Sequence, residues 1–141
     1  MEQFCICATK AVGWCSSSWV IIHHVLLPSL FSVYVNDILC NLERSEFGCH
    51  VSGRYAGALM YADELLLISI TLQDFRNMLD IVYAELSWFD VVLNVKKSGL
   101  LRIGSRFNAD LSPVLINGST LPLVGRMSYL GADIGAGKSL K

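Results

Sequence analysis

The sequence predicts an α+β fold in which an antiparallel sheet packs under helices. Two segments have the apolar periodicity of helices, several short segments have the composition of strands, and two apolar runs flank a turn with two carboxylates. With 141 residues, the chain has the length of a single domain with one core. We expect an irregular N-terminal segment over residues 1–24, the domain itself over 25–132, and a flexible C-terminal tail over 133–141.

The two helices are expected over Ser29–Leu42 and Leu72–Asn94. The first has an apolar stripe at helical spacing, and Pro28 stands just before it. In the second, apolar residues recur at steps of four and three, and Thr71 with Asp74 forms a capping pair at its start. Trp88, which is close to this stripe, is expected in the core.

A hairpin is expected where two extended runs, residues 55–60 and 65–70, flank Tyr61-Ala62-Asp63-Glu64. The second run is apolar on both faces, as in a strand that is buried on both sides. Asn117-Gly118 is the strongest two-residue hairpin signal in the chain. Further extended segments are expected over 99–103, 114–116 and 121–124, the last running on towards 129–131.

Composition excludes several classes of protein. Hydrophobic residues make up 53% of the chain and charged residues 16%, against about 25% in a typical protein, so the chain is not disordered. No stretch of about 20 residues is apolar enough to span a membrane, and the N-terminus does not resemble a signal peptide. We expect an intracellular protein of the cytoplasm or nucleus that is not secreted. Five cysteines, an odd number without zinc-site spacing, indicate small buried thiols.

Charge is divided unevenly along the chain. Residues 1–95 contain four basic and ten acidic residues, a net charge of −6, whereas residues 96–141 contain seven basic and two acidic residues, a net charge of +5. A basic half beside an acidic half suits a protein that places a polyanion near a carboxylate site. An ordinary solvated surface explains the division equally well.

The adjacent carboxylates Asp63 and Glu64 are the first candidates for chemistry. Acidic residues in turns usually face water. Here the flanking strands are too apolar for an ordinary surface hairpin, and carboxylates at the tip of a buried hairpin are costly unless they are paired. Two adjacent carboxylates at a tight turn can bind a divalent cation such as Mg²⁺, which takes one or two protein carboxylates and leaves its other positions to water and phosphate oxygens.

Four segments together resemble the reverse transcriptases of non-LTR (LINE-type) retrotransposons. Tyr61-Ala62-Asp63-Glu64 resembles the Tyr-x-Asp-Asp turn of these enzymes, and Leu27–Leu39 resembles the helix with the pattern SPLLF..Y.NDI. Asn94–Ser98 resembles the N..K(S/T) element, and Ser128–Gly131 resembles the YLG of the primer-grip region. The matches occur in the family's order and cover most of the chain. The resemblance implies a truncated polymerase palm over residues 25–132.

The resemblance also implies an activity, a cofactor and site residues. Reverse transcriptases are RNA-directed DNA polymerases, nucleotidyltransferases that extend a DNA primer on an RNA template with deoxynucleotides and use two Mg²⁺ ions. Asp63 would be a metal ligand, Glu64 would replace the second aspartate, and Lys97 would lie near the leaving pyrophosphate. Contacts to the primer or nucleic acid would come from Tyr61, Tyr129, Leu130 and Gly131.

The sequence also departs from the family. Another metal-binding aspartate of the family lies on an earlier palm strand, but residues 1–26 contain no aspartate, and the fingers and thumb are missing. We therefore expect a catalytically incomplete fragment. A non-enzymatic nucleic-acid-binding or interaction remnant is the alternative, and an unstable relic that aggregates through Leu65–Ile70 is another. Ala132–Ser139 loosely matches a phosphate-binding loop, which functions only when a helix follows it.

Overall fold

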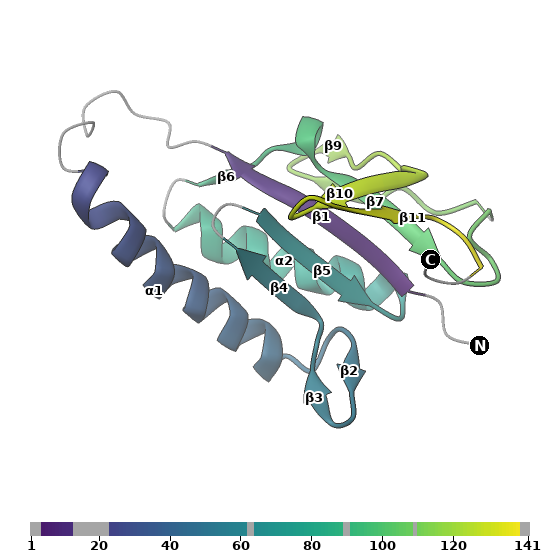
Figure 1. The fold of residues 1–141 in the computed structure, drawn as a ribbon, viewed down its shortest axis with the longest axis horizontal. Helices are drawn as coiled ribbons and strands as arrows, with labels where there is room; N and C mark the ends of the chain where they lie inside the picture. Colours follow the sequence, from purple (N-terminus) through teal and green to yellow (C-terminus); the bar gives the residue numbers. More distant parts are fainter. Residues whose placement is uncertain (1–3, 13–22, 62–63, 89–90, 109, 139–141) are drawn as a thin grey trace.

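The computed structural model describes residues 4–12, 23–61, 64–88, 91–108 and 110–138. A five-stranded antiparallel sheet forms the centre, with two helices against it (Figure 1). The helices are α1 (His23–Arg44) and α2 (Leu72–Ser87), and a short 3-10 helix is η1 (Val95–Lys97). The sheet contains β1 (Phe4–Val12), β4 (Ala58–Tyr61), β5 (Glu64–Ser69), β6 (Val92–Leu93) and β7 (Gly99–Ile103). Three two-stranded ribbons are β2 (His50–Val51) with β3 (Arg54–Tyr55), β8 (Leu115–Ile116) with β9 (Ser119–Thr120), and β10 (Arg126–Tyr129) with β11 (Ala132–Gly135). The predicted α+β class is confirmed.

Strand β1 lies in the middle of the sheet. It pairs with β5 on one side and with both β6 and β7 on the other, always antiparallel, and β4 pairs with β5. The register sets Lys10 opposite Glu64 and Ala11 opposite Leu93. The start of β5 and the end of β6 therefore flank the same end of β1.

The N-terminal segment differs from the sequence-based expectation. An irregular segment was expected over residues 1–24, but Phe4–Val12 forms the central strand of the sheet and α1 already begins at His23. A strand with neighbours on both sides and layers on both faces has no alternation of polar and apolar residues, because both faces are covered. The sequence FCICATKAV contains a single charged residue, Lys10, which is consistent with such a strand.

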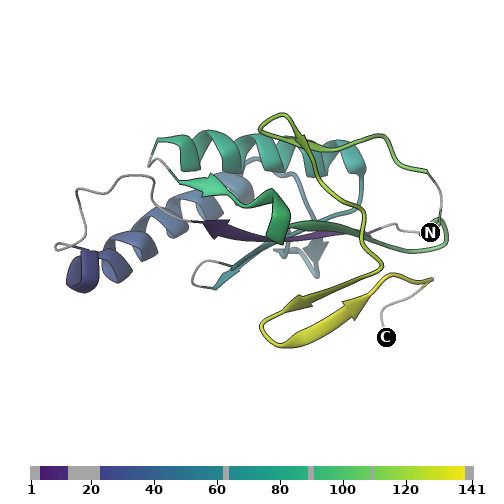
Figure 2. The ribbon, with the colours of Figure 1, turned by 90° about the horizontal axis from the view of Figure 1, so that it is seen from above.

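The sheet has a different cover on each face. Helix α2 covers one face, and the β10–β11 hairpin covers part of the other, so the molecule has three layers in Figure 2. Helix α1 packs beside β4 and against α2. One contact between the helices is polar, since Asn41 Nδ2 donates a hydrogen bond of 2.7 Å to Glu85 Oε1.

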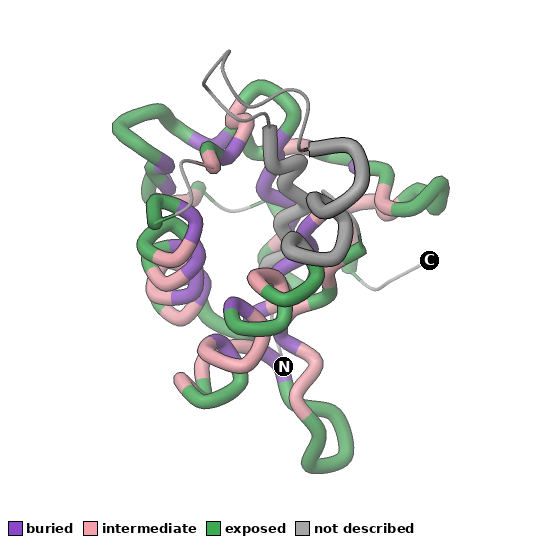
Figure 3. The backbone as a smooth tube through the Cα atoms, turned by 90° about the vertical axis from the view of Figure 1, so that its left-hand side faces the viewer, coloured by how far each residue is buried: buried purple, intermediate pink, exposed green. Residues whose placement is uncertain are grey.

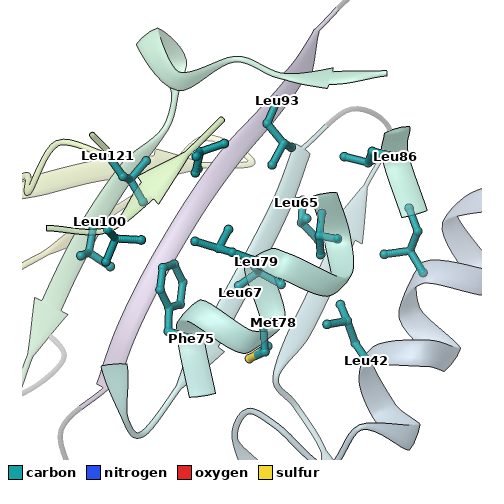
Figure 4. Close-up of a cluster of buried hydrophobic side chains, with 14 residues drawn as sticks. Leu42, Leu65, Leu67, Phe75, Met78, Leu79, Leu86, Leu93, Leu100 and Leu121 are labelled. Atoms are coloured by element: carbon teal, nitrogen blue, oxygen red, sulfur yellow. The ribbon is translucent and has the colours of Figure 1, made fainter. Parts of the chain in front are cut away.

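The main core lies between α2, α1 and the sheet, as Figure 4 shows. Phe75, Met78 and Val82 of α2 are fully buried there, against Leu67 and Leu65 of β5. Burying a side chain of this size contributes about 1.5–3 kcal/mol. Buried, intermediate and exposed positions follow one another along α2, whereas the turns between strands are mostly exposed (Figure 3).

Both helices have ends that differ from the expected ones. Helix α1 begins at His23, so Pro28 lies within it, and α2 ends at Ser87 instead of Asn94. The N-cap of α2 is confirmed, because Thr71 Oγ1 accepts a hydrogen bond of 3.0 Å from the backbone N–H of Asp74. Trp88 was expected in the core, but it follows the last turn of α2 and is 84% exposed. The placement of Trp88 was therefore wrong.

The C-terminal third consists of hairpins and extended segments. Asn117 (φ 49°) and Gly118 (φ 75°) form the expected turn between β8 and β9. Residues 122–124 run beside β7, where Leu100 exchanges backbone hydrogen bonds of 2.8 Å with Pro122 and Val124. The tail expected to be flexible from residue 133 forms most of β11 instead, and Gly137 bridges to Ile103.

A helix that crosses a membrane needs about 20 mostly apolar residues. Within the described parts of the chain, no helix combines the length and the apolar character that a membrane crossing needs. Helix α1, with 22 residues, is the longest of the helices named above. It contains Asp37, Glu43 and Arg44, all of which are exposed.

Candidate functional site

The β4–β5 hairpin forms as expected from the sequence. Its last described pair joins Tyr61 to Glu64, and Asp63 lies outside the described residues. Tyr61 is 66% exposed, and Glu64 is partly buried at the start of β5. The strand behind Glu64 is firmly anchored, because Leu65, Leu66 and Leu67 are at most 4% exposed. A rigid strand therefore presents the Glu64 carboxylate at its first residue.

The turn between β10 and β11 lies directly against this carboxylate. The backbone N–H of Leu130 donates a hydrogen bond of 3.2 Å to Glu64 Oε2, although the two residues are 66 positions apart. Leu130 (φ 50°) and Gly131 (φ 79°) both have the left-handed conformation that a two-residue hairpin turn of type I′ requires. Such a turn favours glycine, and Leu130 adopts it at a steric cost.

The ring of Tyr129 is part of the same contact. Burial of its hydroxyl and, second, the negative charge of Glu64 raise the pKa of Tyr129 above its ordinary value. Both effects favour the neutral phenol. We call Glu64, Tyr129 and Leu130 the hairpin junction. The structure thus brings two of the four resembling segments into contact, through the Glu64 carboxylate and the backbone N–H of Leu130.

Lys97 lies at the same end of the sheet, on the other side of β1. It is the last residue of η1, which follows β6 directly, and it is exposed. Because β6 and β5 flank the end of β1, and adjacent strands are about 4.8 Å apart, the backbones of Leu93 and Glu64 are about 10 Å apart. The structure therefore places Lys97 near the hairpin junction, but not within it.

The segment Asn94–Ser98 is fixed by its own polar side chains. Asn94 Oδ1 accepts hydrogen bonds from the backbone N–H groups of Lys96 (3.0 Å) and Lys97 (3.3 Å). Ser98 Oγ donates a hydrogen bond of 2.6 Å to the carbonyl of Asn94. The asparagine and the serine in the pattern therefore have structural roles, since they cap the turn that presents the lysine.

Metal binding at this end of the sheet depends on few carboxylates. Among the described residues, no group of three or more His, Cys, Asp or Glu side chains is close enough to hold a metal ion. Of the two expected metal ligands, only Glu64 is among the described residues, whereas Asp63 lies outside them; Mg²⁺ takes one or two protein carboxylates in many sites. The neighbouring strand β1 has no acidic residue, and its position opposite Glu64 is Lys10. The sequence pattern did not point to Lys10, because no strand was expected there.

Comparisons with known proteins add no relative. No family model matches this chain, and neither does any curated protein. The resemblance therefore depends on the four ordered segments, from Leu27 to Gly131.

Proposed function

We propose that this chain is the palm part of a non-LTR retrotransposon reverse transcriptase and is catalytically incomplete by itself. The hairpin junction is the observation that supports this most strongly. Two segments that resemble family motifs, 66 residues apart, contact each other through the hydrogen bond from Leu130 to Glu64. A turn with carboxylates beside a primer-holding turn is the arrangement that primer extension requires, because the primer end must lie at the metal.

In this proposal, the residues at the end of the sheet have separate roles. Asp63 and Glu64 hold a divalent cation, which when bound activates the primer hydroxyl and neutralises phosphate charge. Tyr61 is exposed on the edge strand β4 and offers a ring on which a base can stack. The turn at Leu130 and Gly131 supports the primer end, and Lys97 offers a positive charge to the leaving pyrophosphate.

The sequence and position of β1 are the reason for proposing that the metal site is incomplete. This strand lies directly beside the carboxylate hairpin, the place from which a further metal ligand could reach the same ions. Its sequence has no Asp or Glu, and Lys10 stands in register with Glu64. A two-metal site needs more carboxylates than Asp63 and Glu64 supply. The fragment would therefore need a complementing chain for polymerisation.

A second candidate function is nucleic-acid binding without chemistry. The net charge of +5 over residues 96–141 favours it, since this part of the chain includes η1, β7 and the β10–β11 hairpin. Binding to phosphates releases counterions and therefore weakens steeply with salt. It does not require Mg²⁺.

Primer extension and filter binding on the purified chain test both functions. We expect no template-dependent extension of a DNA primer on an RNA template, and binding of that duplex which Mg²⁺ strengthens. Asp63→Asn and Glu64→Gln should remove the Mg²⁺ dependence, whereas Asp110→Asn, an exposed carboxylate between β7 and β8, is the matched control. Salt-sensitive binding that ignores Mg²⁺ in every variant would favour the second function. Extension by the pure chain would contradict the proposed incompleteness.

A further inference from the structure

A cleft of about 630 Å³ with a mixed polar and apolar lining lies at the open end of the β10–β11 hairpin. The register pairs Arg126 with Gly135 at this end and Tyr129 with Ala132 at the turn, so the cleft and the hairpin junction are at opposite ends of the ribbon. Its volume is in the range of small-ligand sites, about 300–1,000 Å³. The lining residues are Phe107, Gly125, Arg126, Asp133, Gly135, Ala136, Gly137 and Lys138.

The charged groups of the cleft favour an anion. Arg126 and Lys138 supply two positive charges and Asp133 one negative charge. The ion pair between Arg126 Nη1 and Asp133 Oδ2 is long, 3.8 Å, and its side chains are 76% and 59% exposed. Exposed pairs of this kind contribute about 0–1 kcal/mol, so a ligand phosphate can compete for the guanidinium. Arginine suits phosphate because its planar donors form two parallel hydrogen bonds.

The glycines of the cleft leave room for a ligand close to the backbone. A Cβ atom at Gly125 or Gly135 would meet nothing within 4 Å, so open space lies above both residues. Phe107, in the turn after β7, is partly buried and adds an aromatic ring to the wall that the glycines and charged residues form. Sites that bind nucleotides or single strands commonly combine cations, which contact the phosphate, with an aromatic ring, on which the base stacks.

The cleft is not a phosphate-binding loop of the strand-loop-helix type. The loose match over Ala132–Ser139 begins in β11, and the described part of this stretch, up to Lys138, contains no helix. Gly137 instead accepts a backbone hydrogen bond of 2.8 Å from Gly104. The glycines and the lysine of the motif therefore line an open cleft between β7 and the hairpin.

We propose that this cleft binds a nucleoside phosphate, either as a free nucleotide or as one unit of a single strand. The phosphate lies between Arg126 and Lys138, and the base lies against Phe107. Asp133 weakens the phosphate contact by repulsion and by its pairing with Arg126. The proposal does not depend on the metal site, since none of the lining residues belongs to the hairpin junction.

Titration calorimetry in EDTA, which excludes the metal site, tests the cleft with three probes: ATP, a dT15 oligonucleotide and inorganic phosphate. We expect Arg126→Gln and Lys138→Gln each to weaken ATP or dT15 binding about tenfold. Asp133→Asn should strengthen it severalfold. Gly135→Val should abolish it while the unfolding midpoint stays unchanged, because the added atoms enter open space. Lys96→Gln, an exposed lysine outside the cleft, is the charge control.

The probes distinguish the two sources of the ligand. If dT15 binds more tightly than ATP with the same variant pattern, a strand is the ligand, and the reverse order indicates a free nucleotide. Three results would overturn the proposal: no binding of either probe, binding that Lys96→Gln weakens as much as Lys138→Gln, and inorganic phosphate binding as tightly as ATP. None of them bears on Mg²⁺ binding by Asp63 and Glu64.

Discussion

The two faces of the central sheet differ greatly in how they are covered. Among the side chains that the structure describes, fourteen buried residues form the cluster on the side of α1 and α2, whereas four form the cluster beneath the β10–β11 hairpin. The same strands supply both, since Leu65 and Leu67 of β5 belong to the first cluster and Leu66 to the second. A helix of 16 residues with one apolar side therefore covers far more surface than two strands of four residues.

This difference separates stability from function within one fold. The helix face contains Phe75, Leu42 and other side chains with no exposed area, and none of the candidate site residues lies in that cluster. The face beneath the β10–β11 hairpin contains the hairpin junction and the cleft lined by Arg126 and Lys138. Both depend on polar groups near the surface. Functional regions are commonly those with fewer buried contacts and lower local stability. The following substitutions, each on one face or the other, are expected to show this difference.

Truncating the two cores should have the largest effect. Phe75→Ala on the helix face should lower the free energy of unfolding by about 3–5 kcal/mol, because it leaves a large cavity. Met127→Ala on the hairpin face should cost about 2 kcal/mol or less, since its small cluster can collapse around the change. Urea denaturation measures both. Equal losses at the two positions would contradict the difference between the faces.

Removing the helix cap should have an intermediate effect. Thr71→Ala deletes the hydroxyl that accepts the hydrogen bond from the N–H of Asp74, and it should cost about 1 kcal/mol. Thr120→Ala, an exposed threonine of β9, should change the stability by less than about 0.5 kcal/mol. The urea midpoints of the two variants, each compared with that of the unsubstituted protein, measure these losses of stability. A loss at Thr120 as large as that at Thr71 would exclude capping as the cause.

Removing a buried hydroxyl group on the helix side of the sheet should stabilise the protein. Tyr55 packs against the main core, and its hydroxyl is buried with no hydrogen-bond partner among the described residues. Tyr55→Phe should therefore raise the free energy of unfolding by about 1 kcal/mol. Thermal and urea unfolding at pH 7 would show this directly, and a loss of stability would contradict it.

Because of Tyr55, we also expect the free energy of unfolding to depend on pH in the alkaline range. Burial and, second, the charge of Glu43 raise the pKa of Tyr55 to about 12 from the ordinary 10.0. Between pH 10 and 12 the unfolded chain loses this proton while the folded chain keeps it, so stability falls as the pH rises through this window. The loss should be smaller in Tyr55→Phe. An identical decline in both proteins would show that other groups cause it.

The smallest effect concerns the hairpin junction. Glu64→Gln keeps an oxygen that can accept the hydrogen bond from Leu130 but removes the charge near Tyr129. We expect the pKa of Tyr129 to fall part of the way to its ordinary value, because burial is the larger cause of its shift. The free energy of unfolding should change by less than about 1 kcal/mol. Carbon NMR of the tyrosine rings measures the pKa of Tyr129 in both proteins. An unchanged pKa would show that the charge of Glu64 does not raise it.

Local signals predicted much of the fold. The cap at Thr71, the turn at Asn117-Gly118 and the β4–β5 hairpin depend on neighbouring residues and were predicted correctly. Strand β1 was missed, because a central strand has no alternation. Helix α2 was extended too far, because Leu93 fits the helical stripe but reaches the core through β6, where pairing with β1 replaces the helix.

The candidate site was predictable in its parts but not in its assembly. Motif resemblance pointed to Glu64, Leu130 and Gly131, but an extended segment was expected to run on towards 129–131, whereas β10 ends at Tyr129 and Leu130 and Gly131 form a turn. Their contact across 66 positions depends on how β10 and β11 cross the sheet, which no local pattern encodes. The same holds for Lys10, whose position opposite Glu64 exists only once β1 has joined the sheet.

The proposal that the hairpin end of the sheet is half of a polymerase metal site requires that Asp63 and Glu64 bind a divalent cation. Mn²⁺ or Mg²⁺ binding to the purified chain, followed by calorimetry and by the metal-induced rise of the unfolding midpoint, tests it most directly. We predict weak binding of one ion that Asp63→Asn and Glu64→Gln each remove and that Asp110→Asn leaves unchanged. Absence of binding to the folded protein, or binding that persists in both hairpin variants, would contradict the claim.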